Sequence, residues 1–168
     1  MAAIQSFDVT SGCDLQEVSN AVNQASKEIS QRFDFKGLDV RIELKQKENL
    51  IVLAAPDEFR LKAVWEVLLT RMTRRGVPVK NLKTGAITPA AGGTVRMEIT
   101  LQQGISSDTA RAIVKLIKER KFKKVQAAIQ GDQVRLSSPS RDELQEVIAL
   151  LKAEDFGIEL AFGNYRSQ

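Results

Sequence analysis

Hydrophobic and polar residues alternate in several short stretches of the chain, and elsewhere hydrophobic residues recur at every third or fourth position. Alternation is typical of half-buried strands, and the second pattern is typical of amphipathic helices. Residues 40–45 alternate between hydrophobic and charged side chains and predict a strand. The hydrophobic stripe from Leu15 to Ile29 predicts a helix over about 14–32, with Asp14 as its N-cap.

The same order of predicted elements occurs in both halves of the chain. The first half has predicted strands at 7–10, 40–45 and 50–55, helices at 14–32 and 57–75, and a weaker extended stretch at 79–88. The second half has a strand at 95–101, a helix capped by Ser106 or Ser107, strands at 125–130 and 133–137, a helix opened by Pro139 and Ser140, and a closing strand at 158–162. Gly131 and Asp132 are a typical two-residue hairpin turn between two of these strands.

This βαββαβ order, found twice, predicts an α+β protein made of tandem ferredoxin-like (RNP-like) domains. Each domain is expected to contain a four-stranded antiparallel sheet with two helices on one face. The Pro-Ala-Ala-Gly-Gly segment at 89–93 predicts a linker, which divides the chain into domains at 1–88 and 94–168. The strand at 7–10 is short enough to pair in the second sheet instead, and one domain would then be discontinuous.

The composition argues against catalysis. The chain has no histidine, and Cys13 is its only cysteine, so Ser-His-Asp sites, Cys-His sites and zinc sites built from His and Cys are excluded. No pair of acidic residues stands out as a carboxylate-based active site. We therefore expect a non-enzymatic protein with no cofactor and no metal. No apolar run approaches the ~20 residues that cross a bilayer, and the N-terminal residues do not resemble a signal peptide, so we expect a cytoplasmic protein without membrane contact.

The net charge of +4 permits an anionic partner without requiring one. RNA-recognition modules share the predicted topology, but they place exposed aromatic residues on the third strand. The third strands here, 50–55 and 133–137, contain no aromatic residue, and no phosphate-binding glycine loop is present. The charge therefore favours a small anionic ligand, with at most weak binding of nucleic acid.

The densest candidate chemistry is the segment Arg32-Phe-Asp-Phe-Lys-Gly37, between the first helix and the second strand. Phe33 or Phe35 could stack on a base while Arg32 or Lys36 binds phosphate, and Asp34 could accept from a guanine edge or a ribose hydroxyl. The segment is equally interpretable as a helix end, in which the phenylalanines close the core and the cations complement the helix dipole.

Two basic clusters are further candidates for phosphate contacts. Arg74 and Arg75 end the helix at 57–75, and several lysines and an arginine lie between Lys118 and Lys124. Basic residues at a helix C-terminus are also an ordinary complement to the helix dipole. Tyr165 is a minor candidate for stacking on a base.

Several motifs of the chain resemble those of the YajQ family, and the resemblance covers essentially the whole chain. They include Ser6–Thr10, Asp14–Val18, Arg32–Gly37 and Ile129–Asp132. The resemblance implies tandem ferredoxin-like domains in a small bacterial cytosolic protein that binds a nucleotide. It also implies that some relatives are cyclic di-GMP effectors that act through partner proteins, and it implies no catalytic activity or metal.

The sequence therefore predicts a nucleotide-binding protein, with cyclic di-GMP as the suggested ligand and a protein as the possible partner. The candidate contact residues are Arg32, Asp34, Phe35, Lys36, Arg74 and Arg75. Two alternatives remain open at this point. The protein could associate weakly with RNA or DNA through its basic surface, or it could be an interaction scaffold that binds no ligand.

Overall fold

The computed structural model describes residues 3–167, which form two compact α+β units. One unit, here called the inserted unit, is continuous and spans Gly12–Gln103. The other, here called the terminal unit, combines the residues up to Ser11 with those from Gly104 onward. Each unit has its own sheet, two helices and a separate hydrophobic core. In the described part of the chain, no helix is both long and apolar enough to cross a membrane.

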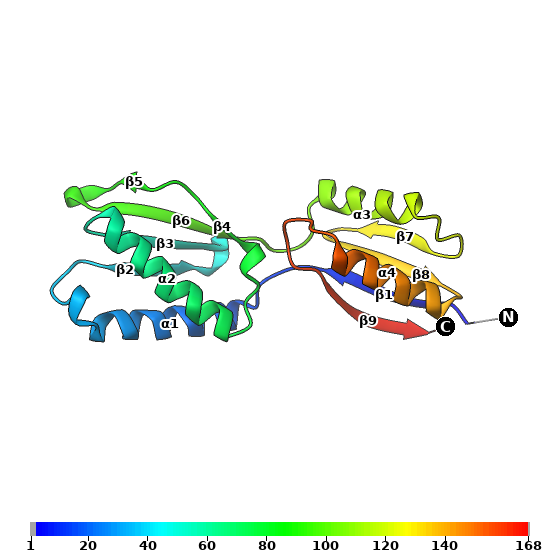
Figure 1. Ribbon diagram of the computed structural model, residues 1–168, viewed down its shortest axis with the longest axis horizontal. Coiled ribbons are helices and arrows are strands. Elements are labelled where there is room, and N and C mark those ends of the chain that lie inside the picture. Colours follow the sequence, from blue (N-terminus) through cyan, green and yellow to red (C-terminus); the bar gives the residue numbers. More distant parts are fainter. Residues whose placement is uncertain (1–2, 168) are drawn as a thin grey trace. The chain divides into compact units, whose positions relative to one another are not determined.

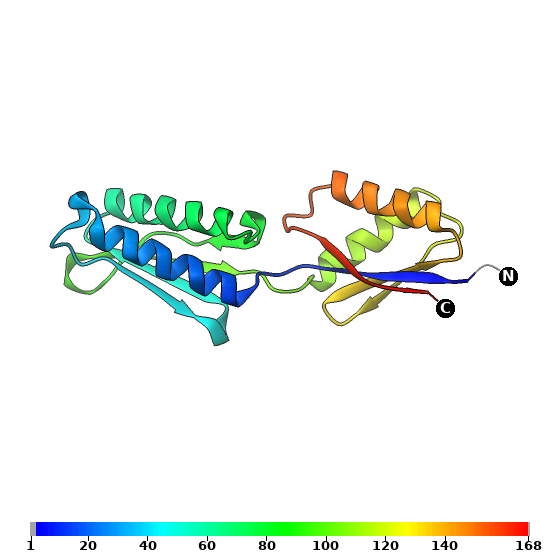
Figure 2. The same cartoon turned by 90° about the horizontal axis from the view of Figure 1, so that it is seen from below.

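The inserted unit packs two helices on one face of its sheet (Figures 1 and 2). Its elements are α1 (Leu15–Gln31), η1 (Phe33–Phe35), β2 (Arg41–Lys45), η2 (Gln46–Glu48), β3 (Leu50–Ala55), α2 (Glu58–Arg74), η3 (Val79–Asn81), β4 (Leu82–Thr84), β5 (Thr88–Pro89), η4 (Ala91–Gly93) and β6 (Val95–Leu101). The strand order is β2-β3-β6-β4, with β5 pairing on β6, and every pairing is antiparallel.

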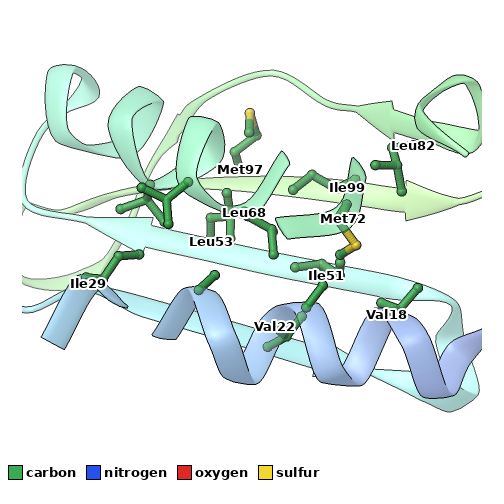
Figure 3. Close-up of a cluster of buried hydrophobic side chains, with 14 of the residues drawn as sticks. Val18, Val22, Ile29, Ile51, Leu53, Leu68, Met72, Leu82, Met97 and Ile99 are labelled. Carbon is green, nitrogen blue, oxygen red and sulfur yellow. The ribbon is translucent and has the colours of Figure 1, made fainter. Parts of the chain in front are cut away.

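The core of the inserted unit follows from the periodicity of its elements. Hydrophobic residues on one face of α1 and α2 meet every second residue of β3 and β6, as Figure 3 shows for Val18, Val22, Leu68, Ile51 and Ile99. Side chains at i and i+2 of a strand share one face of the sheet, so the alternating pattern places them all toward the helices. Asp14 caps α1 by accepting a hydrogen bond from the backbone N–H of Gln16, which confirms the predicted cap.

The terminal unit is built from β1 (Gln5–Thr10) and the part of the chain from Gly104 onward. The remaining elements are α3 (Ser107–Glu119), β7 (Gln126–Gln130), β8 (Gln133–Ser138), α4 (Arg141–Ala153) and β9 (Ala161–Ser167). The sheet order is β7-β8-β1-β9, again antiparallel throughout. The predicted hairpin at Gly131 and the predicted cap of α3 at Ser106 are both present.

The structure differs from the predicted division of the chain at 89–93. This segment does not separate the units, because β6 follows it and pairs with β3 inside the inserted unit. Gly92 and Gly93 have φ values of 71° and 75°, which turn the chain back so that Ala90 donates a backbone hydrogen bond to Thr94. The glycines that predicted a linker therefore form a hairpin turn between β5 and β6.

Neither unit is a continuous βαββαβ segment, contrary to the expected tandem. The chain first forms β1, then the whole inserted unit, and only afterwards the remaining elements of the terminal unit. The strand at 7–10, for which the sequence left two sheets open, pairs with β8 and β9. The closing strand also lies later than expected, at Ala161–Ser167 rather than 158–162, while Ile158 and Leu160 pack against the core ahead of it.

Candidate functional site

The predicted Arg32–Gly37 segment lies at the C-terminal end of α1 and includes the short helix η1. Arg32 caps η1, and its Nε and Nη2 donate hydrogen bonds to the two carboxylate oxygens of Asp34, at 3.0 and 2.8 Å. The Arg32 guanidinium also lies over the ring of Phe35, 5.1 Å from its centre. A carboxylate on one side and an aromatic ring on the other hold the Arg32 guanidinium in a defined orientation.

The two phenylalanines of this segment have opposite environments. Phe35 is buried in the core of the inserted unit, whereas the Phe33 side chain is 89% exposed. The backbone N–H of Lys36 donates to the carbonyl of Phe33, which keeps η1 tightly turned and directs the two rings apart. The Phe33 ring is therefore accessible for stacking on a base, while the buried Phe35 ring packs against the Arg32 guanidinium.

A second exposed phenylalanine lies at the same end of the inserted unit. Phe59 is 82% exposed in the first turn of α2, and Figures 1 and 2 both show the start of α2 at the same end of the inserted unit as η1. The next residue, Arg60, pairs with Asp57 at 2.5 Å. Phe59 was not among the predicted site residues. The sequence does indicate its exposure. Phe59 lies two residues before Leu61, so it is not on the face of α2 that carries the buried residues Leu61, Val64 and Leu68.

A groove between α1 and α2 contains two of the predicted cations. It encloses about 300 Å³ and is lined by Arg32 and Arg74, with Glu28, Ala63, Glu66, Val67 and Thr70 between them. Arg71 pairs with Glu28 at 2.6 Å, whereas Glu66, the other acidic residue of the lining, has no ion pair within residues 3–167. No ion pair is found for Arg74 among the described residues. Arg74 is therefore a cation that remains available to an anionic ligand.

The structure does not bring Lys36 and Arg75 to the lining of this groove. Arg75 pairs with Glu17 of α1 through a contact of 3.1 Å, near the opposite end of α1. Lys36 is exposed beyond η1. The six predicted residues thus fall into three groups. Arg32 and Arg74 line the groove, Asp34 and Phe35 contact the Arg32 side chain, and Lys36 and Arg75 lie outside the groove.

Electrostatics keep the Arg32–Asp34 pair ionised. The hydrogen bonds from Arg32 lower the pKa of Asp34, and the charge of the neighbouring Arg60 lowers it further. The same hydrogen bonds raise the pKa of Arg32. At neutral pH the pair is a fixed dipole with no net charge. Lys36 has no ion pair in the part of the chain that the structure describes, so it is the uncompensated cation next to η1, while Arg74 lies at the other end of α2.

The single cysteine is not a reactive group. Cys13 is buried, and this burial raises the pKa of its thiol, so the thiolate is disfavoured at neutral pH. Across residues 3–167, no cluster of three or more His, Cys, Asp or Glu side chains is arranged to hold a metal ion.

Comparison with known proteins places this arrangement in a family. The model of the family described as "Nucleotide-binding protein YajQ-like" matches residues 5–166. The chain belongs to the YajQ family. It is 54% identical to a nucleotide-binding protein of Koribacter versatilis over 165 residues, which cover 98% of this chain and 99% of that protein. It is also 50% identical to a nucleotide-binding protein of Heliobacterium modesticaldum over 167 residues, covering 99% of this chain and the whole of the relative.

The match to the YajQ family confirms the resemblance predicted from the sequence motifs. Because it runs from β1 to β9, it includes both units and the candidate groove between α1 and α2. A protein of Solibacter usitatus, 52% identical over 162 residues, is likewise named a nucleotide-binding protein. The family is named for binding and not for a reaction.

Proposed function

We propose that this YajQ family member is a non-enzymatic nucleotide-binding protein of the bacterial cytoplasm. Its proposed ligand is cyclic di-GMP, and ligand binding alters an interaction with a partner protein. The observation that carries the proposal is the juxtaposition of Arg32 and Arg74 in one groove, with the exposed ring of Phe33 next to Arg32. The naming of its relatives as nucleotide-binding proteins supports the same class of ligand.

The chemistry of a cyclic dinucleotide fits this arrangement. The ligand has two phosphates and two guanines, so it requires cations at two separate points together with a surface for stacking. Arg32 and Arg74 lie along the same groove. Arg74 supplies a cation without an ion pair among the described residues, and Arg32, whose Nε and Nη2 already donate to Asp34, offers its remaining N–H groups to a phosphate. Phe33, in place of the predicted Phe35, supplies a stacking surface, and Phe59 supplies a second at the same end of the unit.

We also propose that both units are variants of the ferredoxin-like fold. In the terminal unit, the order β7-β8-β1-β9 places the first strand between the third and fourth strands of a discontinuous βαββαβ set. In the inserted unit, the order β2-β3-β6-β4 is the same arrangement if β6, the last strand of this unit, takes the place of the first strand. A permutation of this kind explains why two repeats in the sequence do not correspond to two continuous domains.

Calorimetric titration of the full chain tests the proposed ligand. We expect cyclic di-GMP to bind saturably and more tightly than GTP, ATP or a short oligonucleotide. Arg74→Gln is expected to weaken that binding about tenfold, because one charge-assisted hydrogen-bond pair contributes about 1.5–3 kcal/mol. Phe33→Ser is expected to weaken it by a similar factor.

The matched control is Arg41→Gln, which removes one arginine from β2 of the same unit. Arg41 pairs with Asp39 at the surface and does not line the groove, so this variant should bind like the original protein. If Arg74→Gln bound cyclic di-GMP as tightly as the original protein does, the groove would not be the binding site. If no nucleotide bound, the protein would be better described as an interaction scaffold than as a nucleotide-binding protein. Binding only to the oligonucleotide, with a steep salt dependence, would indicate a weak nucleic-acid-binding protein.

A further inference from the structure

The terminal unit contains a groove of its own. It lies between α4 and the paired residues at the start of β1 and the end of β9. It encloses about 500 Å³, within the range of small-molecule sites. One wall is formed by Leu144 and Ile148, which lie one turn apart on the same face of α4. The opposite side is formed by β1 and β9, including Phe7 and Tyr165.

The sheet side of this groove is aromatic. The rings of Phe7 and Tyr165 are 5.7 Å apart between their centres and are tilted by 39°. Phe7 is fully buried, but Tyr165 is 62% exposed, so its ring offers free surface toward the groove. With the aliphatic side chains of Leu144 and Ile148 opposite, this is an environment for a flat, apolar group such as a heteroaromatic ring.

The charge of the lining is positive. Arg141 and Arg166 line the groove, and none of its other described lining residues is acidic. Arg166 lies 3.5 Å from the Asp8 carboxylate and is partly neutralised by it. Arg141 has no ion-pair partner among the described residues, and Asp142 and Glu143, which follow it in the chain, are not part of the lining. Arg141 is also the first residue of α4, after the cap Ser140, where unpaired backbone N–H groups favour an anion.

We propose that this groove is a second ligand site, which binds an aromatic compound that carries a single phosphate, of the size of a nucleoside monophosphate. The ring stacks on Tyr165 between the two walls, and the phosphate accepts hydrogen bonds from Arg141 at the start of α4. This class of ligand fits three features of the groove: its volume of about 500 Å³, the exposed ring of Tyr165, and Arg141, which has no ion pair among the described residues. The site goes beyond the proposed function, because it lies in the other unit and uses none of the residues assigned to cyclic di-GMP.

Titration of the isotope-labelled full chain with GMP, followed by NMR, tests this site. We expect shift changes at the backbone amides of residues 141–148 and 163–167, and a dissociation constant that rises about tenfold in Arg141→Gln and in Tyr165→Ser. Guanosine, which lacks the phosphate, and inorganic phosphate, which lacks the ring, should each bind more weakly than GMP. The matched control is Arg120→Gln, which removes an exposed arginine after α3 in the same unit and should bind GMP like the original protein.

Arg74→Gln separates this site from the proposed function. GMP binding in the terminal unit should be unchanged in this variant even where binding of cyclic di-GMP is lost. The inference is wrong if GMP shifts only residues around Arg32 and Phe33, if it shifts none, or if Arg141→Gln binds GMP as tightly as Arg120→Gln does. None of these results would by itself remove the proposal for cyclic di-GMP.

Discussion

Replacing Gly104 with alanine is expected to destabilise the terminal unit by about 3 kcal/mol. Gly104 has a φ of +75°, where a residue with a Cβ is strained. A Cβ at this position would also lie 2.7 Å from the Cβ of Asp132 and 2.5 Å from one of its carboxylate oxygens. Neighbouring backbone bonds, from Gly104 to Ser11 and from Ile105 to Asp132, prevent the two segments from moving apart freely.

Gly131→Ala is the matched control for this prediction. Gly131 lies in the same unit and also has a positive φ, but no atom lies within 4 Å of an added Cβ. It should therefore show only the backbone strain, about 1 kcal/mol. If Gly104→Ala cost no more than Gly131→Ala, the close approach of Asp132 would not limit this position.

The chain offers separate spectroscopic probes for the two units. Trp65 is the only tryptophan and contacts the core of the inserted unit, while Tyr165 is the only tyrosine and lies in the terminal unit. In urea unfolding of Gly104→Ala, the tyrosine signal should change at lower denaturant than in the original protein. The direct effect on Trp65 should be smaller, because none of the clashing atoms belongs to the inserted unit.

Local structure was largely predictable from the sequence because its causes are local. Asp14 and Ser106 are caps in the structure, since a short polar side chain before a hydrophobic stripe satisfies the first free amides of a helix. The hairpin at Gly131 follows from a two-residue turn between alternating strands. The mixed α/β class and the two antiparallel sheets follow from these elements.

The pairing of strands distant in sequence was not predictable in the same way. An alternating strand such as β6 indicates which side faces a core but does not specify which core. The pattern of Val95–Leu101 therefore predicts a strand of the second half, whereas the strand pairs with β3 in the inserted unit. Gly92 and Gly93 are compatible with a linker and with a tight turn, and only the partner of β6 distinguishes them. The chain's long-range topology therefore had to come from the structure.

The candidate site shows the same limit. The Arg32-Phe-Asp-Phe-Lys pattern indicated the right residue types, but the choice between Phe33 and Phe35 depends on which ring η1 directs to the core. The groove beside Tyr165 joins residues from both ends of the chain, so no local motif could reveal it. Arg74 and Arg75 are adjacent in sequence, and helical geometry alone directs one to the groove and the other to Glu17.

Asp8 is the buried charge on which the terminal unit depends. Only 2% of this residue is exposed, although the sequence places it at a polar position of β1. Its carboxylate accepts hydrogen bonds from Nε of Arg135 at 2.9 Å and from Nδ2 of Asn164 at 2.6 Å, and Arg166 lies 3.5 Å away. The carboxylate thus joins three neighbouring strands, β8, β1 and β9, at the middle of the sheet.

Asp8→Ala is expected to destabilise the terminal unit by about 2 kcal/mol, because it removes the charged acceptor of the hydrogen bonds from Arg135 and Asn164. Two atoms of Arg166, Nε and Nη2, are already buried without a hydrogen bond, and Asp8→Ala would also remove the ion-pair partner of this arginine. The urea midpoint of the tyrosine signal measures the loss. As a control, Asp39→Ala removes an exposed carboxylate that pairs with Arg41 at the surface, and should change stability by less than about 1 kcal/mol.

The same carboxylate makes the stability of the terminal unit depend on pH. The hydrogen bond from Arg135 lowers the pKa of Asp8 in the folded protein, and this effect outweighs the opposing effect of burial. The unfolded chain therefore binds a proton at Asp8 at a higher pH, about 4, than the folded protein does. The contribution of Asp8 to stability is complete above that pH and is lost as the pH falls through the folded pKa. Asp8→Asn should remove this part of the acid sensitivity; if its unfolding free energy fell between pH 5 and 3 as steeply as in the original protein, other carboxylates would account for the acid response.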